Sequence, residues 1–271
     1  MKTVVISNSF DDMRSQDIRF LEEASKLGHL HTLVWSDDIV QKQTGEAPKF
    51  PHEERLYMMD ANRYVNEVTL VTDLDDINAL PQNIDADIWV TSEKDATPQK
   101  QHYCNTHNVT DHIITAQDTK EYPPVKTDTL SKPSQNKKVI VTGCFDWFHS
   151  GHIRFFEEVS ELGDLYVAVG NDENVRLLKG EHHPMFNQDE RRYVVSSIRF
   201  VTEALITSGM GWMDAAPDIA IIKPDIYAVN EDGDKPEKEA FCKEHGLEYV
   251  VLKRAPKEGL PKRESTALRG F

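Results

Sequence analysis

Two histidines three positions apart, His149 and His152, are the side chains of this chain best suited to hold a phosphate. Side chains with this spacing lie on one face of a helix start, beside backbone N–H groups that the first turn leaves unpaired. Gly151 between them has no Cβ, which lets a bulky ligand approach the backbone closely. Imidazole groups and helix N–H groups together suit an anion. The alternative interpretation is a pair of surface histidines near a helix cap.

The elements around this pair place it at the edge of a sheet. Residues 139–141 form a short apolar run that predicts a buried strand, and residues 142–146 leave it in a loop. From about residue 150 the apolar side chains follow helical spacing, and residues 165–169 restore the strand pattern. A strand, a helix and a second strand of this kind build a parallel sheet, whose ligands sit at the carboxyl ends of the strands.

Three segments together resemble the cytidylyltransferase-like branch of the nucleotidyltransferases. They are TGCFDWFHSGH at 142–152, NDENVRLLKG at 171–180 and DERRYVVSSIRFVTEAL at 189–205. The branch includes glycerol-3-phosphate and ethanolamine-phosphate cytidylyltransferases and the adenylyltransferase domain that activates heptose 1-phosphate. The resemblance extends from residue 137 to the C-terminus. It implies an α/β fold with Rossmann-like parallel sheets flanked by helices.

The resemblance also assigns roles to the matching residues. It implies that His149, His152 and Lys179 are catalytic, with Lys179 on a mobile segment that reaches the nucleotide phosphates. In similar enzymes an arginine at the place of Arg191 orders the site, and Asp146 is expected to orient the loop or a histidine. The residues that it implies for nucleotide binding are Gly143, Cys144, Phe145, Asp146, Gly151, Arg191, Ser265 and Thr266.

The C-terminal segment matches a Ser-Thr run at a helix start in similar enzymes. The hydroxyls of Ser265 and Thr266 and the first N–H groups of that helix can bind phosphate oxygens. Plain helix capping by Ser265 is the alternative. The sequence leaves open which of the preceding basic residues reaches the ligand. The candidates are Lys253, Arg254, Lys262 and Arg263.

Asn230 and Asp232 are the candidates for binding the acceptor. They follow a predicted strand at 225–229, where relatives carry a Gly-Asp pair that helps to hold the second substrate or the nucleotide. This sequence departs from that pattern because it has Asn230 and Glu231 where glycine is usual. The polar side chains could bind acceptor hydroxyls or an ammonium group, or they could form a charged turn.

The N-terminal part of the chain repeats the histidine segment. With a shift of 135 positions, SNSFDDMRSQDIRFLEEASKLGHL aligns with TGCFDWFHSGHIRFFEEVSELGDL. A period this long indicates a duplicated domain. The copy has Arg14, Gln16 and Asp17 where the histidines and the glycine are expected, and a carboxylate there would repel phosphate. We therefore predict a catalytically silent domain at 1–116. The alternative is a regulatory pocket that uses Arg14 for a different anion.

The duplication predicts two tandem domains of the same type. Residues 117–136 are rich in Pro, Thr, Asp, Ser and Lys and have almost no apolar periodicity, which indicates a linker. Residues 137–271 are then the active domain. A fused silent copy would give the active domain an internal pseudo-dimer partner, and a further homodimer is possible.

Composition narrows the class of partner. The formal net charge is −15, from 46 acidic and 31 basic residues, so we expect neither a nucleic acid nor an anionic membrane as partner. The sequence has no apolar stretch long enough for a membrane span or a signal peptide, which leads us to expect a cytoplasmic protein. The three cysteines are widely spaced and suggest neither zinc nor disulfides. No base is placed to activate Cys144, so we expect its thiol to pack.

The expected reaction is transfer of CMP from CTP to a small phosphorylated alcohol or sugar, with release of pyrophosphate. Mg²⁺ bound to the triphosphate is the expected cofactor, and no protein side chain is predicted as a metal ligand. ATP is the alternative donor because CTP and ATP enzymes of this branch share these motifs. A nucleotide-binding regulatory protein without turnover is the alternative from another class.

Overall fold

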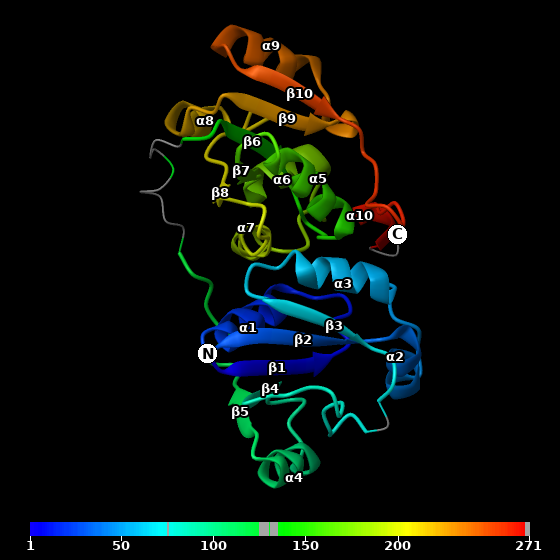
Figure 1. Cartoon of the computed structure of the whole chain (residues 1–271). Coiled ribbons are helices and arrows are strands. Elements are labelled where there is room, and N and C mark those ends of the chain that lie inside the picture. The colour runs from blue at the N-terminus through cyan, green and yellow to red at the C-terminus, as the bar shows by residue number, and fades with distance from the viewer. Residues whose placement is uncertain (75, 125–129, 131–134, 269–271) are drawn as a thin grey trace. The chain divides into compact units, whose positions relative to one another are not determined.

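The computed structural model describes residues 1–74, 76–124, 130 and 135–268, without the side chains of residues 266 and 267. The chain divides into two compact units, Met1–Tyr122 and Pro123–Phe271 (Figure 1). The predicted linker at 117–136 falls partly on residues that the structure does not describe. Each unit is an α/β domain in its own right.

The first unit is a five-stranded parallel sheet in the order β3-β2-β1-β4-β5. Its strands are β1 (Thr3–Asn8), β2 (His29–Trp35), β3 (Glu67–Val71), β4 (Ile88–Ser92) and β5 (Thr110–Ile114). Its helices are α1 (Ser15–Ser25), α2 (Asp37–Thr44), α3 (His52–Asp60) and α4 (Pro98–His107).

The second unit repeats this order as β10-β9-β6-β7-β8, again with all strands parallel. Its strands are β6 (Lys138–Gly143), β7 (Asp164–Val169), β8 (Glu203–Ile206), β9 (Ile226–Asn230) and β10 (Glu248–Leu252). Its α-helices are α5 (Ser150–Ser160), α6 (Asp172–Lys179), α7 (Gln188–Ser196), α8 (Ala216–Ile222), α9 (Pro236–His245) and α10 (Ser265–Leu268). A 3₁₀ turn, η2 (Glu231–Gly233), follows β9.

The fold class predicted from the sequence is confirmed in both units. The apolar run at 139–141 is fully buried in β6, and the predicted apolar face of α5 is buried as well. In each sheet the second and third strands lie on one side of the first strand, and the fourth and fifth strands lie on its other side. The strand order therefore changes direction between β1 and β4 in the first sheet and between β6 and β9 in the second. In open α/β sheets, ligands bind at the carboxyl ends of the strands beside such a point.

Both units turn sharply after their first strand. Phe10 and Phe145, which match each other in the repeat, have left-handed backbones with φ of 51° and 52°. A Cβ at Gly143 would lie 2.6 Å from Cζ of Phe145, so glycine is needed there for the ring to fold back over the end of β6. Both units accept the strain of a left-handed phenylalanine, so this turn is a feature that the two units share.

A buried arginine fastens the turn of the first unit. Arg55 donates to the backbone oxygens of Phe50 (2.9 Å) and Ser9 and pairs with Asp37 (2.6 Å). Asp11 in the turn accepts from the backbone N–H of Phe50 (2.9 Å). These contacts tie the turn after β1 to the start of α3, and we call them the arginine brace.

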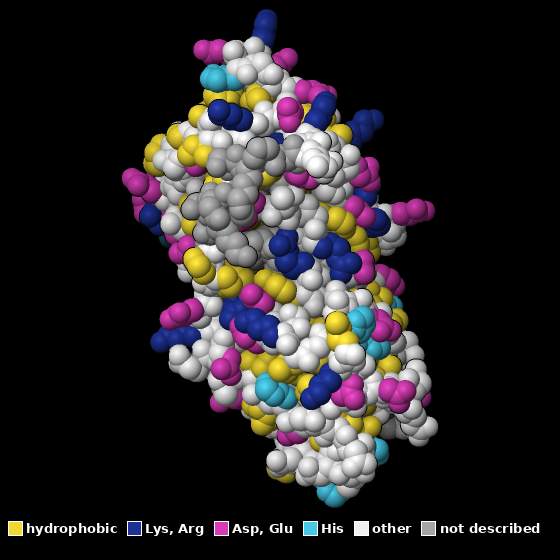
Figure 2. All heavy atoms as spheres, turned by 60° about the vertical axis from the view of Figure 1, so that its left-hand side comes forward, with side chains coloured by type: hydrophobic (Ala, Val, Ile, Leu, Met, Phe, Trp, Pro, Cys, Tyr) yellow, Lys and Arg dark blue, Asp and Glu magenta, His cyan; other side chains and the backbone are white. Residues whose placement is uncertain are grey.

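No described helix has the length and apolar character that crossing a bilayer demands. On the face shown in Figure 2, basic and acidic side chains are interspersed, with apolar side chains between them.

Candidate active site

A cavity of about 340 Å³ opens at the carboxyl ends of β6, β7 and β9 in the second unit. Its walls include the start of α5, the end of α6, the loop before α8 and the turn η2. The predicted site residues that line it are Gly143, Cys144, Phe145, His149, Gly151, His152, Lys179, Asn230 and Asp232. Residues far apart in the sequence are thus brought to one edge of the sheet.

His149 is the N-cap residue of α5, and its hydrogen bond fixes its tautomer. Its Nδ1 accepts from the backbone N–H of Gly151 (3.1 Å), so in the neutral ring Nε2 carries the proton. Nε2 is buried and has no hydrogen-bond partner among the described residues. His149 therefore presents a fixed N–H donor in the cavity.

Gly151 has a structural role besides the one expected from the sequence. A Cβ at this position would lie 2.9 Å from Cε1 and 3.0 Å from Nδ1 of His149, which is closer than real contacts allow. Glycine is therefore required to seat the His149 ring, in addition to leaving the backbone accessible.

His152 stacks on His149, with ring centroids 4.0 Å apart and planes 21° from parallel. The rings of Phe148 and Phe145 lie against it at 5.3 Å each. Burial is the main cause that lowers the pKa of His149 to about 3, and the cationic Arg254 lowers it further. Burial, followed by the neighbouring His149, also lowers the pKa of His152 well below its ordinary value. Both imidazoles are therefore neutral at pH 7.

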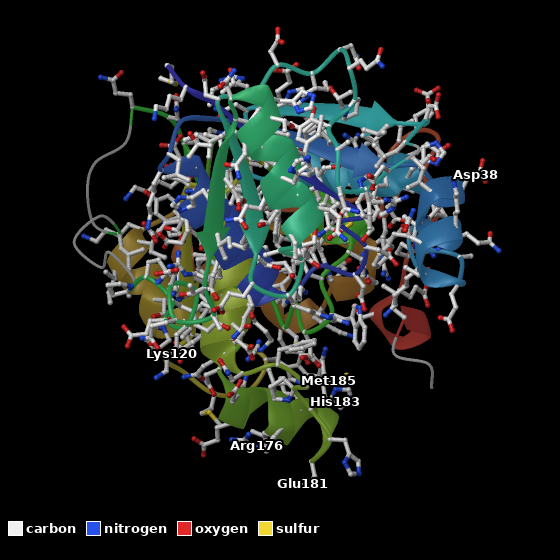
Figure 3. The ribbon with its side chains drawn as sticks, turned by 90° about the horizontal axis from the view of Figure 1, so that it is seen from below. Asp38, Lys120, Arg176, Glu181, His183 and Met185 are labelled. Carbon is white, nitrogen blue, oxygen red and sulfur yellow. The ribbon has the colours of Figure 1, made fainter. Side chains whose placement is uncertain are left out.

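Lys179 and Arg254 supply positive charge at the cavity wall. Lys179, at the end of α6, is exposed at the cavity wall, and Figure 3 shows Arg176 and Glu181, which flank it in sequence, at the outer edge of the view. Of the four basic candidates in the 253–263 loop, Arg254 lines this cavity, and all four line a smaller neighbouring one. Arg254 pairs with Asp232 (2.7 Å), and a guanidinium N–H donates to the Arg263 oxygen (3.0 Å).

Lys238 is a lining residue that the sequence analysis did not single out as a site residue. Its ammonium donates to the backbone oxygen of Gly233 (3.2 Å), and burial lowers its pKa. The available signal was the match between Lys238 and Lys100 in the repeat. Lys100 makes the equivalent bond to the oxygen of Asp95 (2.9 Å), so this lysine also fastens a loop.

Two residues predicted to bind nucleotide are not part of the cavity lining. Arg191 donates to the backbone oxygens of Phe186 (2.9 Å) and Cys144 (2.6 Å) and pairs with Asp172 (2.7 Å). Asp146 accepts from the backbone N–H of Phe186 (3.0 Å). These are the same contacts as in the arginine brace of the first unit, so both residues position the loop that carries the site.

The Ser-Thr segment is also absent from the cavity lining. The hydroxyl of Ser265 donates to the backbone oxygen of Trp147 (3.2 Å), which holds the start of α10 against the motif loop. The side chain of Thr266, also predicted to bind nucleotide, lies outside the described residues.

The first unit has a cavity of about 310 Å³ at the equivalent sheet edge. Gln16 and Asp17 line it, whereas the guanidinium of Arg14 pairs with Asp12 (2.7 Å) and is not part of the lining. The charged residues of the lining are Asp11, Asp17, Glu93, Lys94 and Asp95. Because four of these five are carboxylates, the electrostatics disfavour the alternative of an anion pocket built on Arg14.

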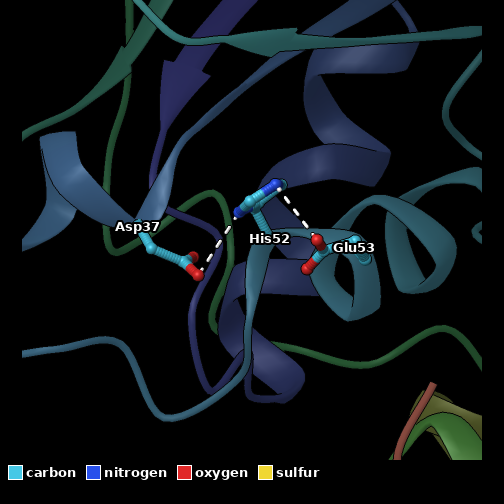
Figure 4. Close-up of side chains that lie close together, drawn as sticks. All are labelled: Asp37, His52 and Glu53. Carbon is cyan, nitrogen blue, oxygen red and sulfur yellow. Dashed lines mark ion pairs between the residues drawn. The ribbon is translucent and has the colours of Figure 1, made fainter. Parts of the chain in front are cut away.

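One cluster in the first unit has the composition of a metal site. His52 lies between Asp37 and Glu53, with Nδ1 3.3 Å from Asp37 and Nε2 3.4 Å from Glu53 (Figure 4). The two nitrogens face different carboxylates, and Asp37 is already paired with the buried Arg55. This cluster is accounted for as an ion-pair network around the arginine brace.

The chain belongs to the cytidylyltransferase-like family, because its second unit matches known members over the segment that forms the cavity. The family model matches residues 140–262. FAD synthase from Aciduliprofundum boonei is 34% identical over 119 residues, which cover 43% of this chain and 76% of that protein. The bifunctional protein HldE from Campylobacter concisus is 36% identical over 106 residues, which cover 39% of this chain.

The matched segment spans only 22% of the length of HldE. A crystal structure of the lipopolysaccharide core biosynthesis protein from Thermoplasma volcanium aligns with 45% of this chain and 98% of its own, with 26% identity and a TM-score of 0.38.

Proposed function

We propose that the second unit transfers a nucleotidyl group from a nucleoside triphosphate to a small phosphorylated acceptor and releases pyrophosphate. The observation that carries the proposal is a stacked pair of neutral imidazoles in the cavity. His149 Nε2 and His152 Nδ1 are both buried there without a hydrogen-bond partner among the described residues. Unpaired buried polar atoms are costly, so a site that keeps two of them beside Lys179 and Arg254 is suited to a phosphate-bearing ligand.

The reaction needs positioning more than it needs a nucleophilic side chain. An oxygen of the acceptor phosphate attacks the α-phosphorus, and the bond to the bridging oxygen breaks as pyrophosphate leaves with the electron pair. The attacking oxygen is already an anion, so the enzyme must align it and offset the charge of the triphosphate. In this proposal His149 Nε2–H donates to a phosphate oxygen, and Lys179 and Arg254 supply the opposing charge.

The expected Mg²⁺ would be carried mainly by the triphosphate. Two carboxylates of the cavity wall are already engaged, since Asp214 accepts from Thr207 (2.8 Å) and Asn174 (2.9 Å) and Asp232 pairs with Arg254 (2.7 Å). Mg²⁺ in nucleotide sites is commonly held by substrate phosphates and waters with few protein ligands, which fits this donor set. When bound, the ion would neutralise charge on the phosphates.

The donor is either ATP or CTP. The motifs of the sequence led us to favour CTP, but a relative named FAD synthase makes a product that contains an adenine nucleotide, which supports ATP. We therefore give the two donors equal weight. The acceptor class remains a small phosphorylated alcohol or sugar, to which the same relative adds FMN, the phosphate that is joined to AMP in FAD.

Pyrophosphate release tests the proposal directly. The full chain is incubated with Mg²⁺, each of ATP and CTP, and acceptors that include glycerol 3-phosphate, ethanolamine phosphate, sugar 1-phosphates and FMN. We expect the unpaired imidazole of His152 to contact the phosphates together with His149, so His152→Ala should lower turnover by at least about a hundredfold.

Arg14→Ala, in the first unit, is the matched control and should leave turnover unchanged. Turnover of His152→Ala near that of the wild type would refute the site. Tight binding of a nucleotide without pyrophosphate release would instead indicate a nucleotide-binding regulatory protein.

A further inference from the structure

Asn230 is the last residue of β9, and its side chain lines the cavity. Its Oδ1 atom is buried and has no hydrogen-bond partner among the described residues. It is therefore a third unpaired polar atom of the cavity, together with His149 Nε2 and His152 Nδ1. A carbonyl oxygen can only accept a hydrogen bond, so it does not suit a phosphate oxygen.

In the first unit the matching position has a local hydrogen-bond partner. Ser92 ends β4 and matches Asn230 in the repeat. Its hydroxyl donates to Asp95 Oδ2 (2.7 Å), so the polar side chain is satisfied locally. In the second unit Gly233 stands at the place of Asp95, so the side-chain bond of the first unit has no counterpart. A carboxylate there would accept from the amide NH2 group of Asn230, so the partner that Oδ1 lacks is a hydrogen-bond donor.

The loop backbone is held in the same way in both units, so a different loop position does not explain the difference. Lys238 donates to the oxygen of Gly233 (3.2 Å), and Lys100 donates to the oxygen of Asp95 (2.9 Å). What distinguishes the units is the side chains. The second unit has an amide in place of the hydroxyl, and the oxygen of this amide needs a donor that the loop does not supply.

Two of the charged donors that line the cavity with Asn230 are already engaged. Arg254 donates to Asp232 and to the Arg263 oxygen, and Lys238 donates to Gly233. Burial of an amide oxygen without a partner destabilises the empty protein. A bound ligand that supplies the missing donor would remove this cost.

We infer that Asn230 is a specificity-determining residue that accepts a hydrogen bond from a hydroxyl or amino group of a substrate, beside its phosphate. The inference rests on the proposed function of the cavity and adds a requirement to it, namely that the phosphate-bearing ligand carries an O–H or N–H group. That group belongs either to the nucleoside of the triphosphate or to the acceptor. If it belongs to the acceptor, aliphatic phosphates without a further hydroxyl or amine are poor acceptors.

The test compares Asn230→Ala with the wild type in the full chain. If the nucleoside supplies the donor, the variant should bind ATP or CTP about tenfold more weakly by calorimetry while inorganic tripolyphosphate binds equally. If the acceptor supplies it, nucleotide affinity should stay unchanged and KM for glycerol 3-phosphate or a sugar phosphate should rise about tenfold. Deoxy-nucleotides, or propyl phosphate in place of glycerol 3-phosphate, should show little difference between variant and wild type.

The melting temperature of the ligand-free protein separates this role from a structural one. Because Asn230→Ala removes an unpaired polar atom, the variant should melt at the same temperature as the wild type or higher. Ser92→Ala, the matched control, breaks a satisfied bond and should lower the melting temperature without affecting substrates.

Unchanged affinity for nucleotide and unchanged KM for every acceptor would overturn the inference, even in a working enzyme. A lowered melting temperature of Asn230→Ala would overturn it as well. If the wild type neither binds nucleotide nor releases pyrophosphate, the proposed function itself fails and the inference fails with it.

Discussion

At the scale of single residues, the pair of stacked histidines is uncharged in the empty cavity. A cationic imidazole would be the stronger phosphate binder in water, but burial and the nearby arginine hold the pKa of His149 far below neutrality. The site therefore offers an oriented N–H donor, and full positive charge is left to Lys179 and Arg254. An oriented donor needs no reorganisation when charge develops during the reaction.

This protonation state makes stability depend on pH. The ordinary pKa of His149 is 6.5 and its pKa in the folded protein is about 3, so the unfolded chain binds the extra proton between these values. The stabilisation is complete above about pH 6.5 and is lost as the pH falls towards 3. His149→Asn keeps a side-chain acceptor for Gly151 N–H without titrating. Relative to this variant, the wild type should lose about 2 kcal/mol between pH 7.5 and pH 5, measured by urea unfolding. An equal loss of unfolding free energy in the wild type and in His149→Asn would contradict the lowered pKa of His149.

At the scale of elements, the second unit has its own arginine brace, made by Arg191. It connects the loop after β6 to α7, the helix that carries Arg191. Arg191 is almost fully buried and holds Cys144, Gly170 and Phe186 by their backbone oxygens. The loop after β6 and the end of β7 therefore share one guanidinium. A lysine cannot reproduce this set, because its donors radiate from a single atom.

The two braces permit a matched experiment. Arg191→Lys and Arg55→Lys should each lower the free energy of unfolding by about 2 to 3 kcal/mol, since each leaves backbone carbonyl groups and a partly exposed carboxylate without their partner. Arg191→Lys should also lower kcat/KM, measured on the folded fraction, because the motif loop shifts. Arg55→Lys should leave kcat/KM of the folded fraction unchanged. Equal effects of both variants on kcat/KM would show that the brace does not position the site.

At the scale of the whole molecule, two copies of one fold differ in the charge of their cavities. The first presents carboxylates at the sheet edge and the second presents imidazole, lysine and arginine. The silence of the first copy, the role of pseudo-dimer partner and a further homodimer stay predictions. Hydrogen exchange with and without ATP or CTP tests the silence of the first copy.

Nucleotide should protect the amides of residues 142–152 in the second unit and leave residues 7–17 of the first unit unchanged. The reason is that a triphosphate is attracted to the cationic cavity and repelled by the acidic one. The protection should disappear in His149→Ala and persist in Arg14→Ala. Protection of residues 7–17 would contradict this prediction, because it would show that the first unit binds the nucleotide.

The sequence predicted the fold well because its signals are local. Apolar runs such as 139–141 and the helical spacing from residue 150 depend only on near neighbours, and they became β6 and α5. The histidine pair and Lys179 were found by motif, and the structure brings them to one cavity.

The remainder of the site depends on contacts between distant residues, which spacing does not reveal. The clash that makes Gly151 necessary involves the ring of His149, and the place of Arg254 at the cavity wall goes with its pairing to the distant Asp232. Arg191 belongs to a family motif, yet its bonds go to the backbone. A motif thus identified the residue without distinguishing ligand contact from support.

The shared left-handed turn and its brace have a broader consequence. Phe10 with Arg55, and Phe145 with Arg191, show that both halves have the same turn and the same arginine contacts, although the side chains that line their cavities differ. The two halves of the chain can consequently be compared with each other, position by position. Positions that agree between the halves report what folding demands, and positions that disagree report where selection on chemistry was relaxed or redirected.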